Sequence, residues 1–143
     1  MGALLGAGAL VFALAGTAAA TLNYATPFGH YASTPSDKSN DASFWEDYLD
    51  LSAGSCSKID GADLTLNEDG SVSLGVAYDW VIVKQANPNA KDVTYDNTIF
   101  KDVTADQTVY ADTNGDNDYD TDDSNGISHV IVCDAATTTT TTT

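Results

Sequence analysis

The side chains that could do chemistry are concentrated in twelve residues, from Asp112 to Asp123. Counting Asp112 as position 1, oxygen-bearing side chains stand at positions 1, 3, 5, 7, 9 and 12, which are Asp112, Asn114, Asp116, Asp118, Asp120 and Asp123. A twelve-residue loop with this spacing can surround a calcium ion with hard oxygen ligands. The segment's carboxylates repel one another, and a divalent cation relieves that repulsion. The sequence therefore predicts a Ca²⁺ site; the alternative is a solvated acidic turn without a specific ion.

The loop resembles the calcium loops of EF-hands, and more closely those of dockerin and thrombospondin type 3 repeats, which end in Asp. The resemblance covers these twelve residues. It implies that four residues bind through their side chains: Asp112, Asn114, Asp116 and Asp123. It also implies that Asp118 binds through its backbone carbonyl and that Asp120 binds directly or through water. Asn117 stands where Gly is usual, and Asn tolerates the left-handed conformation. Asp123 replaces the usual bidentate Glu, which implies a weaker, extracellular-grade affinity.

The first twenty residues carry no charged side chain. As a helix they would span roughly 30 Å, which is the thickness of the hydrocarbon core of a membrane. Gly and Ala dominate the segment, and Gly2 and Gly6 stand in a G-x-x-x-G relation that lets helices approach closely. The predicted assembly residues are Gly2, Gly6, Leu10 and Leu14. We expect a retained packing helix; the alternatives are a signal peptide, whose usual basic residues are missing, and a simple membrane anchor.

The composition excludes some partners. The 143 residues have a formal net charge of −16, with five Lys and no Arg. Phosphate binding needs a cationic patch, so we expect no nucleic-acid partner. Nineteen of the 21 acidic residues are Asp, which favours turns, caps and calcium ligation over helix interiors. The composition therefore favours a loop-rich β protein, and its acidic surface suits an extracellular setting with salt or calcium.

Few residues suggest catalysis. His30 and His129 are the only histidines, and neither has a neighbouring Cys, Ser or Asp arrangement that looks like an activated nucleophile. His129 alternates with apolar residues, which favours a packed or strand-surface histidine. We therefore expect a protein that is not an enzyme. The two cysteines, Cys56 and Cys133, predict one disulfide in an extracellular chain; the alternative is a pair of free, buried thiols.

Alternating apolar residues beyond Gly61 predict the strands that must position the acidic loop. A turn at 67–70 leads into one long predicted strand, 71–84, with the apolar residues from Val72 to Ile82 on one face. The far end of this strand is apolar on both faces, which predicts a central strand. Further strands are predicted at 93–100, 103–110 and 127–133. The expected fold class is mainly β, a small antiparallel sandwich or barrel.

The other segments complete the expected organisation. The S-x-x-E pattern at 43–46 predicts a capping box and a short helix near 44–51. The expected parts are a hydrophobic assembly helix or signal peptide at 1–20, an extended connector at 21–42, a β domain at 43–136 that includes the calcium loop 112–123, and a Thr-rich tail at 137–143. The connector, through residues 21–33, either lies on its own domain or pairs with a neighbouring subunit's sheet edge. Thr137 to Thr143 are candidate sites for glycans.

This order of parts resembles the plan of type IV pilins, the archaeal form more than the bacterial one. The resemblance implies a hydrophobic helix that first anchors the subunit in the membrane and then packs in the filament core. We therefore expect a self-assembling structural subunit of an extracellular, cell-surface filament or pilus, with copies of itself as partners and Ca²⁺ bracing the outer domain. The alternative is a secreted, monomeric calcium-binding adhesion or carbohydrate-binding module whose residues 1–20 are a signal peptide.

Overall fold

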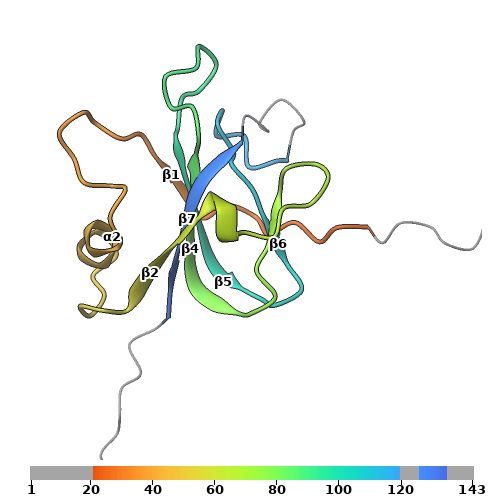
Figure 1. The fold of residues 1–143 in the computed structure, drawn as a ribbon, viewed down its shortest axis with the longest axis horizontal. Helices are drawn as coiled ribbons and strands as arrows, with labels where there is room; N and C mark the ends of the chain where they lie inside the picture. The colour runs from red at the N-terminus through yellow and green to blue at the C-terminus, as the bar shows by residue number, and fades with distance from the viewer. Residues whose placement is uncertain (1–20, 120–125, 135–143) are drawn as a thin grey trace, which may run out of the picture.

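The computed structural model describes residues 21–119 and 126–134. Its elements, in chain order, are β1 (Gly29–Tyr31), α2 (Ala42–Tyr48), β2 (Cys56–Asp60), the 3₁₀ turn η1 (Gly61–Asp63), β3 (Val72–Ser73), β4 (Tyr78–Gln85), β5 (Asn97–Val103), β6 (Thr108–Val109) and β7 (Ile127–Cys133). Five strands form an antiparallel sheet in the order β1-β5-β4-β7-β2, and β3 pairs with β6 in a second, two-stranded sheet (Figure 1). The prediction of a mainly β, antiparallel fold is confirmed.

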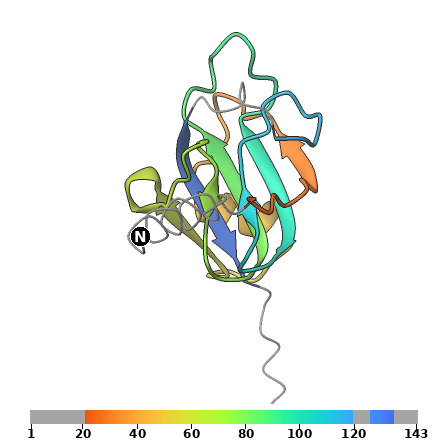
Figure 2. The ribbon, with the colours of Figure 1, turned by 90° about the vertical axis from the view of Figure 1, so that its right-hand side faces the viewer.

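Strand β4 lies at the centre of the five-stranded sheet, with β5 on one side and β7 on the other. Its residues Val81, Ile82 and Val83 are all buried, because both faces of the sheet are covered at this point. The prediction of a central strand from its doubly apolar end is therefore confirmed. Figure 2 shows the sheet with the short strand β1 at one edge.

Two hydrophobic clusters cover the two faces of the sheet. On one face, Val81 and Phe100 pack with Val72 and Val109, so the two-stranded sheet closes this side. On the opposite face, the apolar side chains of β4, β5 and β7 pack with the two cysteines and Trp45 of α2. Figure 1 shows this arrangement, with α2 and β6 on opposite sides of the sheet. The alternation of side chains along each strand supplies both clusters from the same three strands.

The prediction of one long strand at 71–84 is wrong. It is divided into β3 and β4, which belong to different sheets. Gly75 between them has a φ of 71°, a left-handed conformation that breaks the extended pattern. As a result Val72 packs in one cluster and Ile82 in the other, while Val76 is largely exposed. Apolar residues alternate through both strands, so the alternation does not mark the point where the chain passes from one sheet to the other.

The predicted helix is present but shifted, and its capping box is wrong. Helix α2 begins at Ala42 rather than 44 and ends at Tyr48 rather than 51, and its N-cap residue Asp41 makes no side-chain cap hydrogen bond. Glu46, the expected capping partner, instead accepts the backbone N–H of Cys56 at 2.9 Å. Burial of Trp45, whose Nε1 donates to the Ser39 carbonyl at 2.8 Å, fixes the helix on the sheet.

Sequence patterns located the other strands with mixed success. The prediction at 127–133 coincides with β7, whereas the prediction at 93–100 is displaced to β5 and only Thr108–Val109 of the prediction at 103–110 forms β6. The edge strands β1 and β2 were not predicted. Strand β2 has the burial pattern of an edge, with Ser57, Lys58 and Asp60 exposed, so it lacks a sustained apolar signal.

Candidate calcium site

The acidic loop leaves β6 and runs over one end of the sheet. The structure describes its first eight residues, 112–119, which include four of the six predicted ligands. The other two, Asp120 and Asp123, lie outside the described residues. The structure thus describes the first two thirds of the predicted loop.

Asp112, the first predicted ligand, is fully buried. One carboxylate oxygen accepts the backbone N–H of Gly115 at 3.0 Å, and the other accepts that of Asn117 at 2.9 Å. The second oxygen also lies 2.6 Å from Nε2 of His30 on β1. These bonds wrap the loop backbone around the Asp112 side chain.

A repeated turn continues along the loop. The side-chain oxygen of Asn114 accepts the N–H of Asp116 at 2.9 Å, and the carboxylate of Asp116 accepts the N–H of Asp118 at 2.9 Å. Each is an Asx turn, in which a side chain bonds the backbone two residues later. Two of the predicted ligands, Asn114 and Asp116, thus each use one oxygen to bend the backbone two residues later.

Two of the described loop residues adopt left-handed backbone conformations. Asn117 has a φ of 67°, as expected for a residue that takes the usual Gly position, and Gly115 has a φ of 81°. A Cβ on Gly115 would lie 2.7 Å from Cε2 of Tyr95, so the loop packs closely on that ring. The ring of Tyr95 also lies 5.1 Å from the ring of His30, between centroids.

The start of the loop is fixed to the β4–β5 connection and to β5. The carbonyl of Thr113 accepts the N–H groups of Thr94 and Tyr95 at 2.9 and 3.0 Å. The N–H of Asp112 donates to Oγ1 of Thr98 at 2.8 Å. Thr98 and Asp112 are both buried, so the first residue of the loop is held against β5.

The described end of the loop is anchored by tyrosines. The rings of Tyr24 and Tyr119 stack with centroids 4.7 Å apart, and the ring of Tyr110 meets both edge-on. The hydroxyls of Tyr24 and Tyr119 both donate to Asp69, the first to its carboxylate and the second to its carbonyl. Burial, together with the bond to the Asp69 carboxylate, raises the pKa of Tyr24 to about 12. Tyr110 reaches the loop itself, donating to the Asn117 carbonyl at 3.2 Å.

The donor chemistry of the described loop fits calcium. Its predicted ligands offer carboxylate and amide oxygens, and an oxygen that accepts one N–H retains a second lone pair for a cation. Within residues 21–119 and 126–134, however, the structure gathers no group of three or more His, Cys, Asp or Glu side chains that could hold a metal ion. The structure brings the backbone of the loop together around Asp112, and it does not bring the described carboxylates to a common point.

Residues missed by the sequence patterns hold the loop. His30 is separated from Asp112 by 82 positions, so no local spacing relates them. Tyr95 and Thr98 likewise come from the β4–β5 region, where the pattern predicts only a strand at 93–100. These contacts depend on strand register, since β1 places His30 opposite Thr98 on β5.

The predicted disulfide is confirmed. Cys56 and Cys133 face one another in the register of β2 and β7, with their Cα atoms 4.1 Å apart. The two residues form a non-hydrogen-bonded pair, because Asp134 donates to the carbonyl of Ser55 beside them. Side chains approach most closely at such pairs. The bond ties the edge strand β2 to the interior of the sheet.

His129 is buried, as the packed interpretation predicts. Burial lowers its pKa to about 4, and the cations Lys58 and Lys84 act in the same direction, while Asp60 opposes them. Its Nδ1 lies 3.2 Å from Oγ of Ser128, and its Nε2 has no hydrogen-bond partner among the described residues. The imidazole is therefore neutral at neutral pH.

The predicted assembly residues Gly2, Gly6, Leu10 and Leu14, and the Thr-rich tail, lie outside the described residues. Of the helices that the structure does describe, none is long and apolar enough to cross a membrane. A comparison of the chain with protein-family models, with curated proteins and with solved structures finds no match. The case for a function therefore depends on this chain's own residues.

Proposed function

We propose that this protein is a non-enzymatic structural subunit of an extracellular filament or pilus. It self-assembles into a helical homopolymer through its N-terminal segment and carries an outer β domain stabilised by Ca²⁺. The membrane holds the subunit before assembly, and glycans on Thr137 to Thr143 cover its tail.

The observation that carries the proposal is that the β domain fills both faces of its sheet with residues that follow Ala20. Clusters around Phe100 and Trp45 cover the two faces, and a disulfide closes the domain. Figure 1 shows the described chain entering this domain from one side, near β6. We propose that the apolar residues 1–20 make the contacts between subunits.

The calcium part of the proposal has its own test. Titration of Ca²⁺ into the full chain should raise the unfolding free energy by about 2.7 kcal/mol when the ion reaches a hundredfold excess over its dissociation constant. Replacing Asp116 with Ala should abolish this stabilisation, because it removes a predicted ligand. Asp92→Ala is the matched control, since Asp92 is an exposed aspartate outside the loop. Equal calcium responses in the two variants would remove calcium from the proposal.

The assembly part is tested on native material. Intact mass and N-terminal sequencing should find residues of the segment 1–20 in the mature chain, and electron microscopy should show filaments. A mature chain that starts near Thr21 would exclude the packing helix. Featureless monomers under the microscope would exclude a filament of either kind.

A secreted, monomeric calcium-binding module is the second candidate, and one observation favours it. Strand β1 pairs with β5 of its own chain, from Gly29 opposite Ile99 to Tyr31 opposite Asn97. The connector thus completes its own sheet, so the domain needs no strand from a neighbour. In this case residues 1–20 are a signal peptide and the domain acts alone in adhesion or carbohydrate binding.

A further inference from the structure

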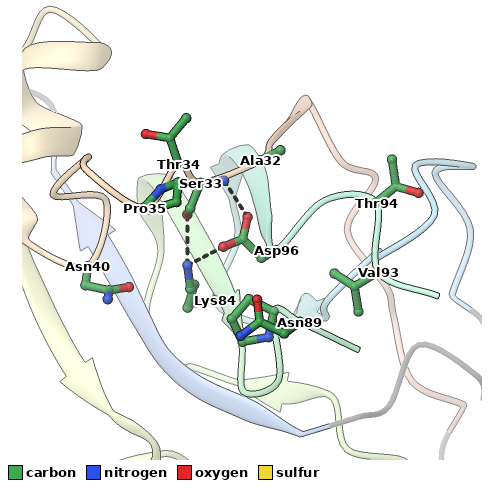
Figure 3. Close-up of a pocket in the computed structure, with 11 residues that line it drawn as sticks. Ala32, Ser33, Thr34, Pro35, Asn40, Lys84, Asn89, Val93, Thr94 and Asp96 are labelled. Atoms are coloured by element: carbon green, nitrogen blue, oxygen red, sulfur yellow. Dashed lines mark hydrogen bonds and ion pairs between the residues drawn. The ribbon is translucent and has the colours of Figure 1, made fainter. Parts of the chain in front are cut away.

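A polar pocket of about 400 Å³ opens on the side of the sheet that carries α2. Its walls come from the segment after β1, from Asn40 before the helix and from the β4–β5 connection, and its floor is formed by Lys84 and Asp96 (Figure 3). None of the described calcium-ligand candidates lines it. The pocket is therefore a separate feature from the loop, and its volume lies within the range of small-molecule sites.

The floor is a buried ion pair. Lys84 and Asp96 are each 6% exposed, and the Lys84 ammonium donates to the Asp96 carboxylate and, at 2.9 Å, to Oγ of Ser33. The N–H of Ser33 donates to the other Asp96 oxygen at 2.7 Å. Burial by itself would raise the pKa of Asp96, but the bonds from Lys84 and Ser33 outweigh it and hold the pKa below its usual value. The pair is therefore ionised and has no net charge.

The ammonium at the floor has a donor to spare. A lysine ammonium carries three N–H groups, and those of Lys84 have two acceptors among the described residues, Ser33 and Asp96. A buried N–H without an acceptor is unfavourable, so an oxygen that enters the pocket gains a hydrogen bond. The Asp96 carboxylate, by contrast, already accepts three hydrogen bonds, from Lys84, from the N–H of Ser33 and, at 3.3 Å, from Nδ2 of Asn97, so the floor offers a donor more readily than an acceptor.

The rim supplies both kinds of hydrogen-bonding group. Asn40, Asn89 and Thr94 are exposed, and their side chains make no hydrogen bond to another described residue. Two carboxamides and a hydroxyl can each donate and accept. No charge in the lining is left uncompensated, and the chain's net charge of −16 disfavours anions.

We propose that this pocket binds a neutral, polyhydroxylated ligand of monosaccharide size. The spare N–H of Lys84 receives one ligand oxygen at the floor, and the carboxamides of Asn40 and Asn89 bond hydroxyls at the rim. A sugar carries many hydroxyl groups that both donate and accept, as the groups of this lining do. An anion or cation would gain little, because the charges of Lys84 and Asp96 already neutralise each other. The ligand is a free sugar or the terminal residue of a glycan, and the inference depends on neither filament assembly nor calcium.

The test is a titration of the full chain with glucose, galactose, mannose and N-acetylglucosamine, followed by ¹H–¹⁵N correlation spectra. At least one sugar should give saturable shifts centred on Ser33, Lys84, Asn89 and Thr94, with little dependence on salt. The matching methyl glycoside separates the two sources. Tighter binding of the glycoside assigns the end of a glycan, and tighter binding of the free sugar assigns the free form.

Rim variants keep the test independent of folding. Replacing both Asn40 and Asn89 with Ala should weaken binding about tenfold or more, since two neutral hydrogen bonds are lost. Asn87→Ala is the matched control, because Asn87 is an exposed asparagine of the same turn that does not line the pocket. The proposal is overturned if none of the sugars shifts these resonances, if glucuronate binds and the neutral sugars do not, or if the rim variant binds as well as the control.

Discussion

Removing the Cys56–Cys133 disulfide should be strongly destabilising. The bond joins residues 77 positions apart, so most of the described domain lies inside the loop that it closes. In the chain-entropy description, a loop of this length removes unfolded-state freedom worth about 4.5 kcal/mol at 25 °C. Since measured losses for natural disulfides run from about 2 to 5 kcal/mol, we expect the double variant Cys56→Ala/Cys133→Ala to lose stability in that range.

The structure adds a local consequence to this global one. Strand β2 is an edge strand that pairs only with β7, and α2 packs against it. The N–H of Cys56 also bonds Glu46 of the helix. Without the covalent bond, β2 should open before the remaining sheet, because among the described strands it pairs only with β7, whereas α2 also keeps Trp45 packed against β4, β5 and β7.

Urea unfolding followed by tryptophan fluorescence can measure both effects, since Trp45 is fully buried in the cluster that contains the disulfide. Reductant should destabilise the wild-type chain and leave the double Ala variant unchanged, which separates loss of the bond from effects of the reagent. A loss below about 1 kcal/mol would refute the loop-entropy reasoning and would indicate that β2 and β7 already associate in the unfolded state.

Three further perturbations have defined outcomes. The folded-state pKa of His129, about 4, lies below its unfolded value of about 6.5, so its stabilising effect is complete above the higher value and is lost as pH falls towards the lower one. Between pH 7 and pH 4.5, the urea midpoint should therefore fall further for the wild type than for His129→Leu. Equal falls in the two proteins would contradict this. Gly115→Ala should cost more than Gly54→Ala in thermal unfolding: both glycines have positive φ, but only Gly115 also faces a ring within 2.7 Å of the added Cβ. Phe100→Ala should cost about 3–5 kcal/mol in urea unfolding, whereas Phe28→Ala should cost less than about 0.5 kcal/mol, because the first ring is fully buried and the second is 63% exposed.

Sequence patterns predicted the interior of this fold better than its edges. Strand β7 was located to the residue, and the doubly apolar end of β4 identified the central strand, because a fully covered strand carries a strong apolar signal. Strand β1 has three residues of intermediate burial, and β2 is mostly exposed, so neither has a clear period. Glu46 shows a different limit of sequence patterns. The S-x-x-E pattern predicts that Glu46 caps its own helix, but its carboxylate accepts a hydrogen bond from Cys56 of β2, which only the tertiary fold brings near.

The candidate calcium site divides in the same way. Local spacing predicted the loop, and the left-handed conformation of Asn117 agrees with the role assigned to its position. The contacts from His30 and Thr98 to Asp112 join distant segments, so they follow from strand register and not from any motif. The pocket around Lys84 also gave no sequence signal, because its lining comes from three separate segments of the chain.

The sheet edges bear on how a filament of this protein would form. Strand β2 is crosslinked to β7. It also carries the exposed charged residues Lys58 and Asp60, which discourage pairing with another sheet. Strand β1 could be exchanged between subunits, but an exchanged copy would make the same bonds to β5 that it makes within its own chain. Exchange alone therefore supplies no new favourable contact to offset the entropy lost on association. For a filament of this protein we therefore propose helix packing through residues 1–20, whose composition is apolar, rather than strand exchange.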